Sequence, residues 1–262
     1  MQLIAPVYGG INLEDISAPR CFEVEARLRE LLDIPVFHDD QHGTAVVVLA
    51  ALKNALKLVK KDLGKTKIIL SGAGAAGTAI ARLLVLAGAK NIIGFDKSGV
   101  INKKSASNNA MRKWFIDNCN PEQFEGNLNQ AMNGADIFIG VSAPNLLSEA
   151  DIQSMAKGSI VFALANPDPE IDPVLARKHA AVVATGRSDQ PNQINNVLAF
   201  PGIFRGLLDA GASKITDELL VACAEAIASC VSESQLNASF IVPSVFDANV
   251  VKSVADAVKR FT

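Results

Sequence analysis

The chain has 262 residues, of which 49% are hydrophobic and 20% charged, and its formal net charge at pH 7 is −2. This composition excludes a disordered chain and is typical of a folded protein with a sizeable core. The charge gives no electrostatic reason to bind nucleic acid, and no apolar run approaches the roughly 18 residues of a membrane span, so we expect neither partner. Four scattered cysteines without a CxxC pair predict reduced thiols and a cytoplasmic protein.

The first elements are short. The stretch IAPVY reads as a strand close to the start of the chain, as if the chain begins inside a fold. A helix is expected from Pro19 to about Leu32, because proline is tolerated in the first turn of a helix. The short strand IPVF follows it.

From about residue 66, short apolar runs alternate with segments of helical length. The runs are KIIL, NIIGF, DIFIGV, SIVFAL and AAVVAT. This alternation predicts βαβ units and a parallel sheet that is buried on both faces. Helices are expected afterwards near 201–210, 216–230 and 246–260. The predicted fold class is α/β: a Rossmann-type, doubly wound parallel sheet with flanking helices, preceded by the tail end of a first α/β domain.

A glycine-rich turn gives the strongest general signal in the sequence. Gly72, Gly74 and Gly77 fit GxGxxG between the strand KIIL and an apolar helix. In such a turn the first glycine permits a tight bend, the second lets the backbone approach a pyrophosphate, and the third lets helix and strand pack closely. We expect this turn, with Ala75 and Ala76, to bind a dinucleotide. The alternative is a glycine-rich turn with no ligand.

An acidic residue, Asp96, ends the next predicted strand, about 20 residues further on, where dinucleotide-binding folds place one. A carboxylate there accepts hydrogen bonds from a ribose 2′-OH and repels a 2′-phosphate, which favours NAD over NADP. Lys97 and Ser98 could receive the extra phosphate, so NADP stays open as a cofactor.

Two adjacent acidic pairs stand in the first 40 residues. Glu14 and Asp15 follow GGINL, and Asp39 and Asp40 precede the apolar run AVVVLAAL. Carboxylates gathered in a small space repel one another unless protons or a cation intervene, and oxygen ligands suit Mg²⁺ or Mn²⁺. Helix capping by the aspartates and a solvated turn at the first pair are the alternatives, and residue type alone favours them.

Several sequence blocks stand in the order and wording seen in malic enzymes, especially the shorter bacterial type. They are GGINLEDISAP, IPVFHDDQHGTA, GAGAAG, ALANPDPEI, TGRSDQPNQINNVLAFPGIFRG and IVPSVFD. They cover nearly all of the chain, and several are long enough to be specific to that family. The sequence therefore resembles malic enzymes.

The resemblance implies roles for the acidic pairs. Glu14, Asp15 and Asp40 would hold the divalent metal, Mg²⁺ or Mn²⁺. Asp39 would be a catalytic residue beside the reacting centre, where the family's aspartate helps to position a lysine. One aspartate of the second pair would then bind the cation, and its neighbour would belong to the proton-transfer network.

Further residues gain roles from the same motifs. Asn166 would lie by the nicotinamide and the substrate, and Asn196 would donate to a substrate carboxylate, since an amide fixes a carboxylate without adding charge. Thr44 would contribute a hydroxyl or a capping bond near the nucleotide. His38 and His42 are expected to be structural hydrogen-bond donors.

The resemblance further implies oxidative decarboxylation of (S)-malate to pyruvate and CO₂ with reduction of NAD or NADP, in an intact protein that is a homodimer. Family members use a lysine and a tyrosine for proton transfer. Here the only tyrosine is Tyr8 and no lysine precedes Lys53, and neither matches the context of those groups. We expect residues 1–40 to be the remainder of an N-terminal catalytic domain, residues 41–262 to be the NAD(P)-binding domain, and the activity of this chain alone to be weak or absent.

Two other interpretations stay open. The chain could be a catalytically silent dinucleotide-binding fragment that needs a partner polypeptide. It could also be an NAD-dependent dehydrogenase of another family, which would keep the glycine turn but make no use of Glu14, Asp15 and Asp40.

Overall fold

The computed structural model describes residues 1–105 and 110–262, which contain two sheets. The strands are β1 (Ile11–Leu13), β2 (Val36–His38), β3 (Lys67–Ser71), β4 (Asn91–Asp96), β5 (Gly99–Val100), β6 (Ile137–Gly140), β7 (Ile160–Ala163) and β8 (Val182–Thr185). The α-helices are α1 (Arg20–Leu31), α2 (Thr44–Val59), α3 (Ala75–Leu86), α4 (Ala110–Asn118), α5 (Leu128–Met132), α6 (Glu149–Gln153), α7 (Pro173–Ala176), α8 (Phe200–Ala210), α9 (Asp217–Ser229) and α10 (Ala248–Phe261). Shorter turns are η1 (Ala5–Val7), the π-helical η2 (Asp39–Gly43), η3 (Leu63–Lys65) and η4 (Asn196–Leu198).

The larger sheet has the strand order β5-β4-β3-β6-β7-β8. Its pairs are parallel except for the antiparallel pair of β4 and the short β5. From β3 the chain first builds toward β4 and then returns to build β6, β7 and β8 on the other side. The strand order therefore reverses between β3 and β6, the place where open α/β sheets bind ligands. The five strands predicted from about residue 66 onward and the predicted fold class are confirmed.

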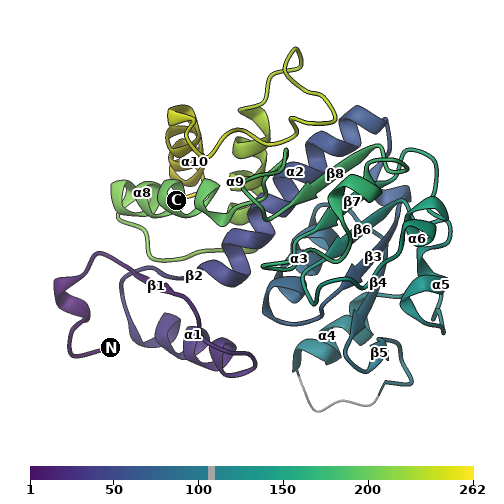
Figure 1. Ribbon diagram of the computed structural model, residues 1–262. Helices are drawn as coiled ribbons and strands as arrows, with labels where there is room; N and C mark the ends of the chain where they lie inside the picture. The colour runs from purple at the N-terminus through teal and green to yellow at the C-terminus, as the bar shows by residue number, and fades with distance from the viewer. Residues whose placement is uncertain (106–109) are drawn as a thin grey trace.

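Alternating residues of the strands enter two different cores, which explains why these runs are apolar throughout. In β3, Ile68 and Leu70 belong to the larger core, together with residues of α2, α3 and α9. Ile69 between them belongs to a second core with residues of α5 and α6. Figure 1 shows the same arrangement, with α2 and α9 on one side of the sheet and α5 and α6 on the other. Burial on both faces requires this pattern in a parallel sheet.

Helix α2 is the central helix of the larger core. The continuous helical stretch Asp39–Val59 is long and apolar enough to cross a membrane by length and composition, although the sequence reading expected no such segment. Most of its apolar window is buried inside the protein, and α2 packs against α3 and α9. Burial in the core accounts for its apolar character.

Strands β1 and β2 and helix α1 lie together at one end of the molecule, drawn in purple in Figure 1. Strands β1 and β2 pair in parallel, and Ile11, Leu13 and Val36 form a separate small core with side chains of α1. The expected strand at IAPVY is wrong, because Ala5–Val7 forms a 3₁₀ turn with a proline at its start. The helix expected near Pro19 is confirmed as α1.

Candidate functional site

The glycine-rich turn lies between β3 and α3, as predicted. Gly72 has a φ of 110°, and a Cβ there would lie 2.7 Å from the carbonyl oxygen of Val141. A Cβ on Gly77 would collide with the carbonyl oxygen of Gly72, whereas a Cβ on Gly74 would meet nothing within 4 Å. The fold itself therefore requires Gly72 and Gly77. Gly74 faces open space, as expected of a residue whose backbone a pyrophosphate approaches.

A cavity of about 330 Å³ opens beyond the ends of β6, β7 and β8. Its lining consists of Thr44, Ala76, Val141, Ser142, Leu164, Ala165, Asn166, Gly186, Ile194, Asn195 and Asn196. The structure thus brings together residues from the starts of α2 and α3, from the strand ends and from η4. This is the position in which the second half of a dinucleotide lies in an open α/β sheet.

Asp96 ends β4, next to the glycine turn, because the N–H groups of Gly72 and Ala73 both donate to the carbonyl oxygen of Phe95. One carboxylate oxygen of Asp96 accepts the N–H of Ser98 at 2.7 Å. The other oxygen lies 2.9 Å from Nη1 of Arg112 on α4. Arg112 therefore places a cation beside the carboxylate that is expected to bind the ribose; the roles of Lys97 and Ser98 toward a 2′-phosphate stay predictions.

The two acidic pairs meet at one edge of the small sheet. Leu13 of β1 stands opposite His38 of β2 in a parallel register, so Glu14 and Asp15 leave their strand beside Asp39 and Asp40. The N–H of Asp15 donates to Oδ2 of Asp40 at 3.0 Å. No side chain caps η2 or α2, so the capping alternative for the aspartates is wrong. We call Glu14, Asp15, Asp39 and Asp40 the carboxylate edge.

Asp39 links the carboxylate edge to the cavity. Its Oδ2 accepts a hydrogen bond of 2.6 Å from Nδ2 of Asn196. Its Oδ1 is buried without a partner and lies against Gly43, where a Cβ would collide with it. Burial, together with the negative charges of Glu14 and Asp40, raises the pKa of Asp39 to about 6. A nearby cation would favour its ionised form.

The carboxylate edge has the donor chemistry of a hard-cation site, since it offers oxygen ligands only. Its negative charges also act on one another, as the effect of Glu14 and Asp40 on Asp39 shows. Within residues 1–105 and 110–262, however, no group of three His, Cys, Asp or Glu side chains is arranged to hold a metal ion. The donors converge without forming a closed ligand set, and the metal-binding roles of Glu14, Asp15 and Asp40 stay predictions.

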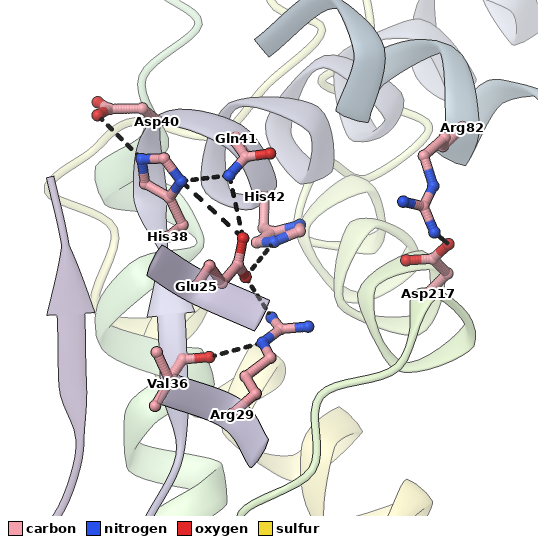
Figure 2. Close-up of polar contacts among 9 residues, drawn as sticks. All are labelled: Glu25, Arg29, Val36, His38, Asp40, Gln41, His42, Arg82 and Asp217. Atoms are coloured by element: carbon pink, nitrogen blue, oxygen red, sulfur yellow. Dashed lines mark hydrogen bonds and ion pairs between the residues drawn. The ribbon is translucent and has the colours of Figure 1, made fainter. Parts of the chain in front are cut away.

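A buried carboxylate on α1, Glu25, supports the turn that carries this edge (Figure 2). It pairs with Nη2 of Arg29 at 2.7 Å and with Nε2 of His42 at 2.7 Å, and it accepts from Nε2 of Gln41 at 3.0 Å. Gln41 also contacts Nδ1 of His38. Burial disfavours the charged form, but the bond from His42 and the charge of Arg29 hold the pKa of Glu25 below its usual range. Both histidines are thus structural partners in this network.

Sequence reasoning missed several residues of the site. Glu25 and Arg112 act across long sequence separations, and Gly43 is required only because Asp39 folds back on it. Glu170 was quoted within ALANPDPEI without a role, yet its carboxylate is fully buried between two strand ends. A glutamate among prolines directly after a buried strand was the available signal.

Residues 41–262 match the family described as "Malic enzyme, NAD binding domain". An NAD-dependent malic enzyme from Geobacillus stearothermophilus is 57% identical over 98% of this chain and 54% of its own length. A bifunctional malic/malolactic enzyme from Bacillus subtilis is 49% identical over 99% of this chain and 64% of its own length.

Solved structures agree with this result. The crystal structure of an NAD-dependent malic enzyme from Thermotoga maritima superposes with a TM-score of 0.93 at 47% identity, over 98% of this chain and 68% of that one. Malic enzyme from Pyrococcus horikoshii gives 0.93 at 45%, over 99% and 62%. The chain thus spans about half to two thirds of the length of these relatives. It belongs to the malic enzyme family and carries that family's NAD-binding domain.

Proposed function

We propose that the chain binds NAD, or NADP, across the glycine turn and the cavity. We further propose that it supplies the carboxylate edge for oxidative decarboxylation of malate to pyruvate and CO₂ in a cytoplasmic homodimer. The observation that carries this proposal is the hydrogen bond between Asp39 and Asn196, because it joins the carboxylate edge to the cavity. The names of the relatives, NAD-dependent and bifunctional malic enzymes, support the choice of substrate.

The side chains of the cavity can orient a small dicarboxylate. The side-chain amide of Asn196 donates one N–H to Asp39. Its second N–H can donate to a substrate carboxylate. Asn166, in the loop after β7, offers another amide to the same space. Glu14, Asp15 and Asp40 would hold the divalent cation, which stabilises negative charge on the oxygen at C2 during oxidation and decarboxylation.

The cavity has few side chains that could act as a general acid or base for proton transfer. None of its lining residues is a lysine or a tyrosine, and Asp39, the carboxylate of the edge that bonds to a lining residue, is engaged by Asn196. Loss of a positioned acid or base typically costs about 10²–10⁴-fold in rate. We therefore propose that these 262 residues bind the dinucleotide but turn malate over slowly or not at all unless further sequence or another polypeptide supplies these groups.

Calorimetric titration with NAD and NADP, together with a malate oxidation assay containing Mn²⁺, tests the proposal. We expect one nucleotide per chain and little or no pyruvate. Rapid pyruvate formation would show that acid and base groups exist within the chain. Failure to bind either nucleotide would contradict the assignment of the cavity.

A further inference from the structure

Glu170 has a buried carboxylate that joins two loops of the cavity. Its side chain is 0% exposed. Oε1 accepts the N–H of Ser142 at 3.1 Å, and Oε2 accepts the N–H of Ala165 at 3.0 Å. Ser142 follows β6 and Ala165 follows β7, and both line the cavity. One side chain therefore fixes the ends of two adjacent strands at the candidate site.

The backbone near Glu170 adds to the same connection. The N–H of Asn145 donates to the carbonyl oxygen of Pro169 at 3.1 Å, and the N–H of Leu147 donates to that of Glu170 at 3.0 Å. The loop after β6 is thus bonded along its length to the loop after β7. Asn166, which lines the cavity, follows directly after the anchored Ala165.

The last residue of β6 leaves room for this carboxyl group. A Cβ on Gly140 would collide with Cδ and Oε1 of Glu170. Gly140 has no positive φ that would demand glycine, so the space is needed for the glutamate side chain. The sequence thus provides both the buried carboxylate and the gap through which it reaches the two N–H groups.

A buried carboxyl group is a costly way to stabilise a fold. Burial raises the pKa of Glu170, and the hydrogen bonds from Ala165 and Ser142 act in the opposite direction. A well-packed apolar side chain often serves stability equally well or better. What an apolar side chain could not do is hold two backbone N–H groups at fixed positions, which is the requirement of a binding site.

We propose that Glu170 is a positioning residue that fixes the cavity wall for the nicotinamide half of the dinucleotide. The inference rests on the proposed binding of NAD. The adenosine half is expected on the side of Asp96 and β4, and the nicotinamide half beyond the reversal of strand order, over β6 and β7. The bonds of Glu170 lie entirely on the second side.

Two variants and one control test this role. Glu170→Gln keeps the size of the side chain but retains only one acceptor oxygen for two N–H groups. Gly140→Ala leaves Glu170 intact and displaces its carboxyl group. Asp151→Asn is the control, because Asp151 is also a buried carboxylate that accepts a backbone N–H, that of Ser148 at 2.7 Å, but it does not line the cavity.

Each protein is titrated calorimetrically with NAD and with ADP-ribose, which lacks the nicotinamide, at a temperature at which its thermal melt shows it folded. We expect both variants to bind NAD about tenfold more weakly, with ADP-ribose affinity within about twofold of wild type. The control should keep both affinities even if its melting temperature falls. If either Glu170→Gln or Gly140→Ala does not fold, the NAD and ADP-ribose affinities of the other variant test the role of Glu170.

Unchanged NAD affinity in a folded cavity variant, or an equal loss for NAD and ADP-ribose, would overturn the positioning role. If the wild-type chain binds neither ligand, the proposed function itself fails, and this inference fails with it. If the wild type binds both, any failure belongs to the role of Glu170 alone.

Discussion

Two buried carboxylates, Asp39 and Glu170, bond to residues that line the same cavity and differ in how their oxygens are hydrogen-bonded. Each carboxylate oxygen of Glu170 accepts a hydrogen bond from a backbone N–H. Asp39 bonds through one oxygen only, to Asn196, and its other oxygen is buried without a partner beside further negative charge. The first group is complete in this chain and organises backbone. The second is suited to a proton or a bound cation.

The largest expected effect is the loss of Mn²⁺ affinity when a carboxylate of the carboxylate edge is removed. Asp40→Ala and Glu14→Ala should each weaken Mn²⁺ binding by about 100-fold, because a carboxylate ligand is lost. The binding is measured by electron paramagnetic resonance of free Mn²⁺. Asp33→Ala is the matched control, since Asp33 is an exposed carboxylate of the same segment. Equal Mn²⁺ affinity in all four proteins would remove the metal from the proposal.

A second prediction concerns the stability of the metal-free chain. The pKa of Asp39 is about 6 in the folded state against 3.8 ordinarily, so its stabilising contribution is greatest below about pH 4 and is lost as pH rises through 6. Asp39→Asn removes this loss and can still accept from Asn196. We expect the variant to be more stable than wild type by about 3 kcal/mol at pH 7.5, with a gain that shrinks toward pH 4.

Urea unfolding at several pH values with a chelator present measures this difference. Asp33→Asn serves as the control and should show no such trend with pH. A stability gain of the same size at pH 4.5 and pH 7.5 would mean that Asp39 is not held partly protonated in the folded chain.

Two substitutions in the glycine turn are expected to separate an effect on NAD affinity from an effect on stability. Gly74→Ala places a methyl group in open space, so the melting temperature should stay nearly unchanged while NAD affinity falls about tenfold, because the pyrophosphate can no longer approach. Gly77→Ala is the comparison, since its Cβ would collide with Gly72 and should lower stability by about 1–3 kcal/mol. Calorimetry and thermal melts read the two effects. Full NAD affinity in Gly74→Ala would place the pyrophosphate elsewhere.

The smallest expected effect is on the choice of cofactor. Asp96→Ala removes the carboxylate that pairs with Arg112 and leaves the cation beside the ribose position. The ratio of NADP affinity to NAD affinity should then rise about fivefold, because repulsion of a 2′-phosphate is relieved. Parallel titrations with the two nucleotides measure the ratio. A ratio that does not change would mean that Asp96 does not face the ribose.

Local patterns in the sequence were sufficient for the sheet and the phosphate turn. Runs such as KIIL and SIVFAL are strands because both faces of the sheet are buried, and GxGxxG lies where the strand order reverses. The two acidic pairs were visible in the sequence, but their meeting depends on the parallel pairing of β1 and β2, which only the structure shows.

Contacts between distant segments could not be predicted in the same way. The link from Asp39 to Asn196 spans 157 residues and that from Glu170 to Ser142 spans 28. Sequence spacing predicts neither bond, because each depends on the positions of the loops relative to the sheet. The 3₁₀ turn at Ala5–Val7 was missed for a different reason: short apolar runs resemble strands unless a partner strand is known.

The central claim is that NAD lies across the glycine turn and over the ends of β6 and β7, and amide NMR of the labelled chain during NAD titration tests it most directly. We predict saturable shifts of the amide signals of Gly74, Ser142, Ala165 and Asn166, with β1 and α1 little changed. Saturable binding that leaves these four signals in place would contradict the account.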